Sequence, residues 1–283
     1  ISLLGLTPVL VDIDLDTYNI DISAIKNAIT PKTKAIIPVH LFGQAAMMSE
    51  IIALAGENEL YVVEDNAQSI GANYTFPDGI KKKTGTLGHI GTTSFFPSKN
   101  LGAYGDGGAI FTDDDQLAHK LRGMVNHGMY VRYHHDEVGV NSRLDSIQAA
   151  ILDIKLNYLD FYNECRKAAA IKYTQRLANH PKIITPITSG DCDSHVYHQY
   201  TLRIIDADRD ALVKYLNEKN IPCGVYYPIP LHLQKAYTSD RYNEANFEIT
   251  NQVVNEVISL PMHTELTDDQ IELVTHEIKT FLT

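Results

Sequence analysis

Short apolar runs alternate with stretches of helical periodicity through the first half of the chain. The runs that read as strands cover residues 8–13, 35–39, 60–63, 92–96 and 109–111. Residues 48–57 carry apolar positions at helical spacing between the second and third of these runs. Nearly continuous apolar strands that alternate with helices are typical of a covered, mainly parallel sheet. The pattern therefore predicts an α/β architecture.

The pattern changes in the second half. Residues 145–177 keep helical periodicity without proline or glycine, which predicts a long helix leading away from the sheet. A strand-like stretch at 199–204, a helix-like stretch at 209–219, the run 224–227 and a last helix at 268–281 follow. We expect a large domain over residues 1–160 and a smaller α/β domain over residues 161–283, joined by a helix.

Composition and charge exclude some classes of partner and indicate the cellular compartment. The 283 residues carry a formal net charge of -11, which argues against a protein that binds nucleic acid or an anionic membrane surface. No apolar stretch is long enough to span a bilayer. Three cysteines without metal-site spacing, Cys165, Cys192 and Cys223, indicate reduced thiols in a cytoplasmic protein. The first six residues resemble the end of a helix and lack an initiating Met, so we expect the natural N-terminus to be missing.

Two segments carry chemistry. In the first, the apolar run through Val63 ends in Glu64 and Asp65, with Gln68 close behind. Carboxylates at the carboxyl end of a strand lie where open α/β sheets bind ligands. Solvated acids or helix N-caps explain this segment equally well when it is taken alone.

The second segment places Lys99 just after another strand, between small and polar residues. The glycines that follow suit tight backbone turns beside a flat ligand: Gly102, Gly105, Gly107 and Gly108. A surface lysine is the commoner explanation for any single lysine. The glycines lack GxGxxG spacing and precede a strand, which excludes a dinucleotide fold.

The two segments together indicate a function much more specifically than either does alone. The sequence resembles the DegT/DnrJ/EryC1/StrS family of nucleotide-sugar aminotransferases, which depend on pyridoxal 5'-phosphate and share the fold-type I, aspartate aminotransferase-like architecture. The resemblance rests on four stretches in order: EDNAQ at 64–68, SFFPSKNLG at 94–102, GDGGA at 105–109 and GVNSRLDSIQAA at 139–150.

The resemblance implies a role for each matching residue. Lys99 would bind the cofactor as a Schiff base and later move a proton. Asp65 would pair with the pyridine nitrogen, Gln68 with the phenolic oxygen of the ring, and Ser94 with the phosphate. Asn141 would reach that phosphate from the neighbouring subunit of a homodimer.

Three further residues would contact the substrates. Arg143 would bind a substrate carboxylate bidentately, and Tyr226 and Tyr227 would lie near the sugar or the nucleotide. The implied reaction moves an amino group, with L-glutamate the expected donor, to a nucleotide-linked keto-sugar. The best candidates are UDP-2-acetamido-3-keto-glucuronate and a dTDP-3-keto-6-deoxyhexose, with a product used in bacterial surface polysaccharide such as lipopolysaccharide.

Two alternatives stay open. One is a sugar dehydratase of the same family, although such members carry histidine in place of Lys99. The other is an inactive relic that binds a sugar nucleotide, favoured by the apparent absence of the family's opening segment with its phosphate-binding turn.

Several histidines suggest other sites. His134 and His135 lie beside Asp136 and Glu137, but adjacent residues of a strand face opposite ways, so we expect no metal site. His195 and His198 are interpreted as surface or packing histidines. No GxSxG elbow supports a serine hydrolase.

Overall fold

The structure is a computed structural model that describes residues 1–188 and 195–283. Its first unit is built on a four-stranded sheet in the order β1-β2-β5-β6. The strands are β1 (Ala35–Ile36), β2 (Tyr61–Asp65), β5 (Ile90–Ser94) and β6 (Gly108–Phe111). β1, β2 and β5 run parallel, and β6 is antiparallel to β5. The predicted α/β class with a mainly parallel sheet is confirmed.

Helices α1 (Ile22–Ala28) and α2 (Met48–Glu57) belong to the core of this unit. Helix α2 has the bounds that its periodicity predicts, because its apolar residues fall on one stripe. Met48 and Ile51 of that stripe are fully buried with Ile36 and Val62 of the sheet. Each such side chain stabilises the fold by about 1.5–3 kcal/mol.

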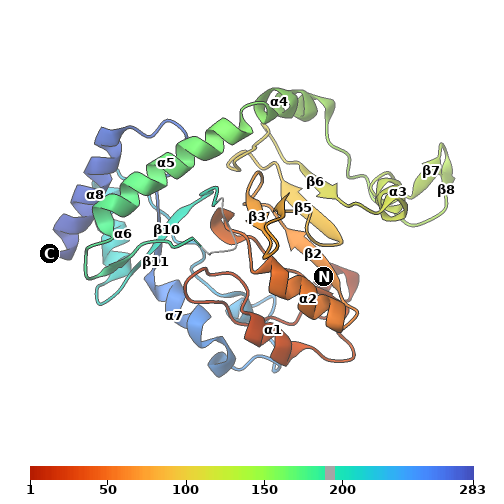
Figure 1. Ribbon diagram of the computed structural model, residues 1–283, viewed down its shortest axis with the longest axis horizontal. Coiled ribbons are helices and arrows are strands. Elements are labelled where there is room, and N and C mark those ends of the chain that lie inside the picture. The colour runs from red at the N-terminus through yellow and green to blue at the C-terminus, as the bar shows by residue number, and fades with distance from the viewer. Residues whose placement is uncertain (189–194) are drawn as a thin grey trace.

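Smaller elements surround the sheet. They are the hairpin of β3 (Asn73–Thr75) and β4 (Lys81–Lys83), helix α3 (Asp115–Met124), and the hairpin of β7 (Met129–Val131) and β8 (His134–His135). Short 3-10 helices cover Ser2–Leu4, Leu41–Gly43, Leu231–Leu233 and Glu244–Phe247. Helix α3 and the β7–β8 hairpin form an arm that projects from the body of the molecule (Figure 1).

The long helix predicted over residues 145–177 is two helices, α4 (Ser146–Leu156) and α5 (Leu159–Leu177). The break has a local cause, because Nδ2 of Asn157 donates to the backbone oxygen of Asp153 at 2.7 Å and Asn157 ends α4. Helix α5 then crosses the molecule to the second unit (Figure 1).

The second unit is a three-stranded antiparallel sheet, in the order β11-β10-β9, packed against helices. Its strands are β9 (Ile183–Ile184), β10 (Tyr200–Ile204) and β11 (Val257–Leu260), and its helices are α6 (Arg209–Glu218), α7 (Glu248–Glu256) and α8 (Asp268–Leu282). Residues of α5, α6 and α8 form one buried core with β10 and β11. The run 224–227 contributes only a bridge from Gly224 to Ser259.

The strand expected at residues 8–13 is absent from the described chain, where only a bridge between Ile13 and Ile20 occurs. Hydrogen bonds to residues 242–250 hold this segment instead. Tyr242 Oη donates to the backbone oxygen of Pro8 at 2.9 Å, and Asp12 accepts from the first turn of α7. Contacts with the second unit take the place of the neighbouring strand that the apolar pattern suggested.

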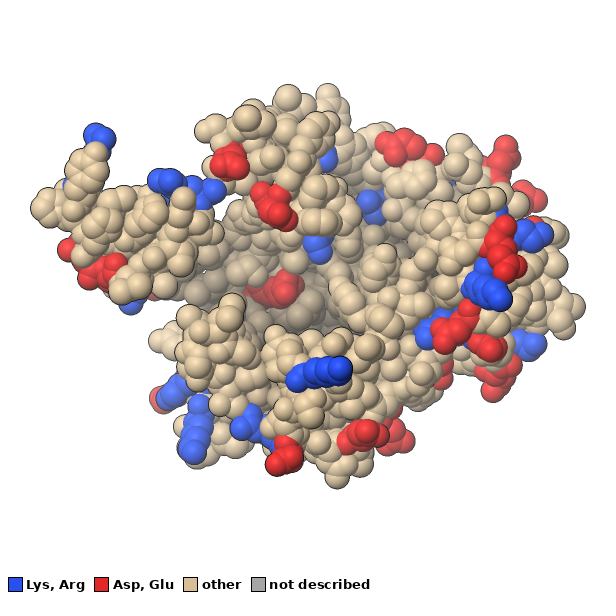
Figure 2. Space-filling view, turned by 180° about the vertical axis from the view of Figure 1, so that it is seen from behind, with Lys and Arg blue, Asp and Glu red and all other residues tan. Residues whose placement is uncertain are grey.

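Among the described residues, none of the helices has the length and apolar character needed to cross a bilayer. Acidic and basic side chains are interspersed over the face shown in Figure 2, and that face is hollowed near its centre.

Candidate active site

The carboxyl end of β2 positions Asp65 as predicted. Its backbone is fixed by the neighbouring segment, since Asp65 N donates to Pro38 O at 2.9 Å and His40 N donates to Asp65 O at 3.0 Å. One carboxylate oxygen accepts from Ala67 N at 3.0 Å. The other has no hydrogen bond to any of residues 1–188 or 195–283, so it can accept from a ligand.

Lys99 lies in the turn that follows β5, the strand beside β2. Its backbone N–H donates to Phe96 O at 2.9 Å, which closes the turn. The amine is half-buried, and no described residue accepts a hydrogen bond from it. Burial lowers the pKa of Lys99, and the negative charge of Asp65 opposes that shift. The structure therefore brings a partly desolvated amine within the electrostatic reach of Asp65.

Gln68 is oriented from both ends. Its Oε1 accepts from the backbone N–H of Phe42 at 2.6 Å, and its Nε2 donates to Tyr227 Oη at 3.2 Å. The phenol thus comes from the second unit. Because the amide nitrogen carries two protons, one N–H remains for a ligand. Tyr226 and Tyr227 pack edge to face with ring centroids 5.9 Å apart, and both are partly exposed.

Ser94 ends β5, two positions beyond the residue that pairs with Asp65. Its hydroxyl accepts from Phe96 N at 3.2 Å, which leaves the hydroxyl proton for an acceptor such as a phosphate oxygen. Ser94 and Asp65 thus lie on neighbouring strands at one edge of the sheet.

Asn141 and Arg143 are not brought into this group within one chain. Both are exposed, and both contact Asn126, which lies between α3 and β7. Asn141 forms a bridge with Asn126, and Arg143 Nη1 donates to Asn126 Oδ1 at 3.2 Å. Neither contacts Lys99 or Asp65.

The glycines after Lys99 are constrained by protein atoms. A Cβ on Gly102 would lie 2.3 Å from Pro97 O, and one on Gly107 would lie 2.8 Å from the side chain of Leu144. Close packing within the chain at these two positions is consistent with the tight backbone turns expected there.

The sequence interpretation missed two polar residues beside Lys99. Asn100 is buried, and its Oδ1 lies 3.2 Å from Nδ1 of His198. His198 was interpreted as a surface or packing residue, and that reading is incomplete. His195 does pack, with its ring stacked on Tyr197 at a centroid distance of 3.9 Å. The sequence signal for Asn100 was its place in the SFFPSKNLG stretch, directly after Lys99.

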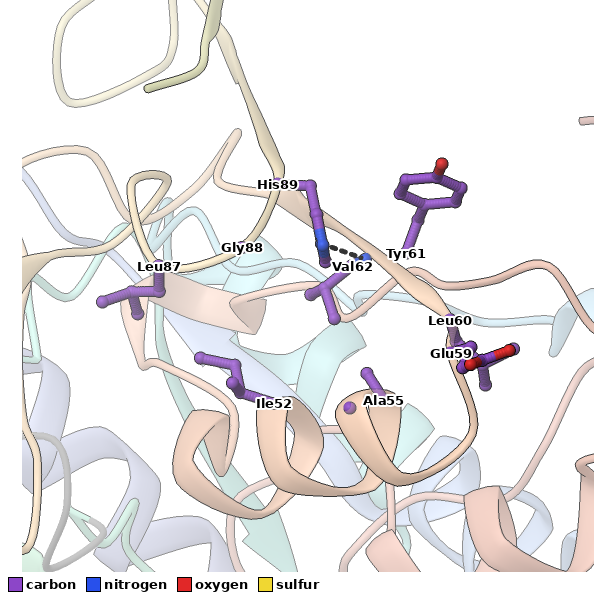
Figure 3. Close-up of a pocket in the computed structure, with 10 residues that line it drawn as sticks. Ile52, Ala55, Glu59, Leu60, Tyr61, Val62, Leu87, Gly88 and His89 are labelled. Carbon is purple, nitrogen blue, oxygen red and sulfur yellow. Dashed lines mark hydrogen bonds between the residues drawn. The ribbon is translucent and has the colours of Figure 1, made fainter. Parts of the chain in front are cut away.

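A pocket of about 550 Å³ lies at the opposite end of β2 (Figure 3). It is lined by Ile52 and Ala55 of α2, by Tyr61, and by Leu87 and His89 before β5. Ligands of open α/β sheets bind beyond the carboxyl ends of the strands, whereas this pocket lies at the amino end. It contains none of the predicted site residues.

In the described part of the chain, His, Cys, Asp and Glu side chains form no group of three or more that could hold a metal ion. Cys165 and Cys223 are free thiols, and Cys192 lies outside the described residues.

Residues 1–279 match the DegT/DnrJ/EryC1/StrS aminotransferase family. The chain belongs to this family. It is a pyridoxal-phosphate-dependent aminotransferase of the fold-type I class, as the sequence motifs predicted.

Individual relatives agree with that assignment. The chain is 47% identical over 279 residues to a pleiotropic regulatory protein of Geobacillus stearothermophilus, covering 98% of this chain and 73% of the relative. It is 44% identical over 274 residues to a UDP-2-acetamido-2-deoxy-3-oxo-D-glucuronate aminotransferase of Pseudomonas aeruginosa, covering 97% and 73%. The crystal structure of S. venezuelae DesV in complex with a ketimine intermediate superposes with a TM-score of 0.92 at 38% identity, covering 99% and 73%.

The residues of this aminotransferase fit the cofactor chemically. Pyridoxal phosphate needs an amine for its aldehyde, a carboxylate for its ring nitrogen and a donor for its phenolic oxygen. Lys99 offers an amine without a hydrogen-bond acceptor among the described residues, Asp65 a free carboxylate oxygen, and Gln68 a free N–H.

Proposed function

We propose that the protein transfers an amino group from L-glutamate to a nucleotide-linked 3-keto sugar. The preferred acceptor is UDP-2-acetamido-3-keto-glucuronate, and a dTDP-3-keto-6-deoxyhexose is the second candidate. The observation that carries the proposal is the half-buried amine of Lys99, which has no hydrogen-bond acceptor among the described residues and follows the strand next to the one that ends in Asp65. Relatives named for the two kinds of sugar are 44% and 43% identical to the chain, so the preference for the first sugar rests on Arg143, whose guanidinium suits a uronic carboxylate.

When bound, pyridoxal phosphate supplies an electron sink that stabilises negative charge on the substrate carbon. Lys99 would hold the cofactor through Nζ and would move a proton at the substrate carbon. Asp65 would keep the ring nitrogen protonated, Gln68 would donate to the phenolic oxygen, and Ser94 would bind the phosphate. Because burial lowers its pKa, Lys99 gives up its proton more readily than an exposed lysine.

The substrate side of the site would be built by Arg143 and the two tyrosines. The planar guanidinium of Arg143 matches a carboxylate with two parallel hydrogen bonds, and both the donor and the uronic-acid substrate carry one. Tyr226 and Tyr227 offer partly exposed rings next to Gln68, suited to contact the sugar or the nucleotide.

We further propose a homodimer with shared sites. Asn141 and Arg143 lie away from Lys99 within one chain, so a second copy would have to supply them. Helices α4 and α5 also expose large apolar side chains: Ile147, Ile154, Leu156 and Phe161. Such a face is typical of a protein interface. The free thiols of Cys165 and Cys223 fit a cytoplasmic protein, and the amino sugar would serve surface polysaccharide.

The first experiment is a visible absorption spectrum of the purified full-length gene product with added pyridoxal phosphate, followed by L-glutamate. We expect a Schiff-base band that glutamate converts to the pyridoxamine band. The band should be absent in Lys99→Ala and present in Lys120→Ala, an exposed control. A band that ignores both glutamate and the Lys99 change would contradict the proposal.

Mixing two inactive variants tests the shared site. If Asn141 acts in the partner's site, Lys99→Ala mixed with Asn141→Ala forms hybrid dimers with one intact site. Random exchange then restores about a quarter of wild-type activity. Hybrids that form without any activity would show that Asn141 acts within its own chain.

A further inference from the structure

The segment that carries His198 lies tightly against the first unit. Val196 N donates to Gly43 O at 3.0 Å, and Gln199 N donates to Phe42 O at 3.3 Å. A Cβ on Gly43 would lie 2.9 Å from the backbone nitrogens of Tyr197 and His198. The backbone of this segment is therefore placed by the loop that also orients Gln68.

Hydrogen bonding fixes the orientation of Asn100. Its Nδ2 donates to Asn163 Oδ1 at 2.8 Å and to the backbone oxygen of Val196 at 3.0 Å. A backbone oxygen only accepts, so the atom that faces it must be Nδ2. Oδ1 of Asn100 therefore faces His198, 3.2 Å from Nδ1.

It follows that Nδ1 of His198 carries a proton and donates to Asn100. Burial lowers the pKa of His198 to about 3, and the positive charges of Lys99 and Arg166 act in the same direction. The imidazole is thus neutral at physiological pH. Its Nε2 is then an unprotonated acceptor, without a hydrogen bond to any described residue.

The same hydrogen bonds connect the parts of the site. Asn100 follows Lys99 directly in the chain. Asn163 of α5 accepts from Asn100 and donates through Nδ2 to Ile70 O at 3.2 Å, just beyond Gln68. One buried amide therefore ties the lysine turn to α5, to the segment of His198 and, through Asn163, to the Gln68 loop.

We propose that His198 is a positioning residue for Lys99, acting through Asn100. The hydrogen bond from Nδ1 of His198 fixes the orientation of the Asn100 amide. The amide in turn stabilises the turn from which Lys99 points toward the cofactor. This inference rests on the proposed role of Lys99 as the cofactor lysine. The neutral ring also adds no second positive charge beside the lysine.

The backbone at His198 does not depend on its ring. Nη1 of Arg166 lies within hydrogen-bond distance, 3.2 Å, of three backbone oxygens, and its two protons are shared among them: those of Tyr197, His198 and Met262. A substitution of the imidazole therefore leaves the segment in place and removes mainly the hydrogen bond to Asn100.

The test compares His198→Leu, which loses the donor, with His198→Asn, whose amide nitrogen can take the place of Nδ1. The control is His195→Leu, a fully packed histidine on the same segment that does not contact Asn100. Each protein is measured for pyridoxal phosphate affinity by absorbance titration and for thermal unfolding without cofactor.

We expect His198→Leu to bind the cofactor roughly threefold to tenfold more weakly, the factor expected for one lost hydrogen bond. His198→Asn should return to within about twofold of wild type. His195→Leu should lower the unfolding temperature and keep wild-type affinity. In the double variant with Asn100→Ala, the two losses should not add, because both remove the same interaction.

Wild-type affinity in His198→Leu would overturn the inference. So would failure of His198→Asn to recover, or an equal loss of affinity in His195→Leu, which would indicate a general structural effect. If the wild-type protein itself shows no Lys99-dependent band, the proposed function fails instead, and the two failures are thereby distinguished.

Discussion

Nε2 of Gln68 donates to Oη of Tyr227 at 3.2 Å, across 159 positions of the chain. Oε1 of the same amide accepts from Phe42 N at 2.6 Å, so turning the amide over would set its NH2 group against the Phe42 N–H and lose that hydrogen bond. The bond joins a residue of the first unit to a loop of the second. A side chain proposed to bind the cofactor is thus oriented by one proposed to bind the sugar.

Tyr227→Phe removes the acceptor of this bond and leaves the Gln68 amide held only through the Phe42 N–H. We expect pyridoxal phosphate to bind roughly fivefold more weakly, about 1 kcal/mol, the usual worth of one hydrogen bond. Absorbance titration of the purified protein measures this. Tyr226→Phe is the matched control, because the hydroxyl of Tyr226 does not contact Gln68, and its cofactor affinity should be that of wild type. Equal losses in both variants would contradict the prediction.

The charge of Asp65 affects the pKa of the Lys99 amine. Burial lowers the pKa of Lys99, and the carboxylate of Asp65 raises it. Asp65→Asn removes the opposing charge, so the pKa of Lys99 should fall further and more neutral amine should be present at pH 7. In cofactor-free protein, acylation of Lys99 at pH 7, followed by mass spectrometry, should become faster. Asp113→Asn, an exposed control, should leave the rate unchanged; a slower reaction in Asp65→Asn would refute the argument.

Arg143 should distinguish the two candidate sugars. If its guanidinium binds the uronic carboxylate, Arg143→Leu lowers kcat/KM for the glucuronate substrate on the order of 10- to 100-fold more than for the dTDP-deoxyhexose. Single-turnover amination of pyridoxamine-loaded protein separates this effect from binding of glutamate. Arg132→Leu, which changes an exposed arginine between β7 and β8, is the control. Equal losses for both sugars would assign Arg143 to another role.

The local sequence was sufficient to predict a helix, or the end of a strand, where the residues of that element alone determine it. Helix α2 follows from its own apolar stripe, and β2 ends at Asp65 because apolar residues give way there to acids. Asp65 and Lys99 could be placed at one sheet edge because the strands before them are parallel neighbours.

Sequence reasoning was insufficient where the deciding contact comes from a distant part of the chain. The apolar pattern of residues 8–13 predicts a strand. The segment is instead held by hydrogen bonds to residues more than 230 positions away, from Tyr242 to Pro8 and from Ile249 to Asp12. His198 could not be assigned because its partner, Asn100, lies 98 positions earlier. Periodicity carries no information about such pairs.

Glu64 precedes Asp65 in β2, and its carboxylate is fully buried and accepts four hydrogen bonds. Its donors are Nε2 of His40 at 2.8 Å and the backbone N–H groups of Gly85, Leu87 and Gly88 at 2.8, 2.6 and 2.7 Å. Burial raises the pKa of Glu64, but the hydrogen bonds from His40 and the backbone outweigh it, so the net pKa is lowered. The ionised form is therefore part of the folded state.

A lowered folded-state pKa contributes stability above the unfolded value, and this contribution is lost as the pH falls through the folded value. Glu64→Gln turns an amide group toward donors and should lower the free energy of unfolding by roughly 3–5 kcal/mol at pH 7. Urea unfolding at neutral and acidic pH measures both effects, and the difference between the proteins should shrink in acid. Glu57→Gln, exposed at the end of α2, should change neither. A pH-independent difference would show that Glu64 acts through packing alone.

Asp12 acts as the N-cap of a helix that begins more than 230 residues later. Its Oδ2 accepts from Ile249 N at 2.9 Å, and its Oδ1 accepts from the backbone N–H and hydroxyl of Thr250 at 2.9 and 2.6 Å. The residue in the cap position of α7 is Phe247, which has no side-chain acceptor. The free N–H groups of the first turn therefore take their acceptor from the opposite end of the chain.

Asp12→Ala should lower the free energy of unfolding by about 1–2 kcal/mol, as the loss of a cap does. Amide exchange at Ile249 and Thr250 should accelerate more than exchange in α8, because only α7 loses its acceptor. Asp14→Ala is the matched control, since Asp14 accepts only from nearby residues such as Thr17. It should destabilise its own turn and leave the first turn of α7 protected. If both variants speed exchange in α7 equally, the segment would stabilise the second unit by general packing, and the cap itself would be dispensable.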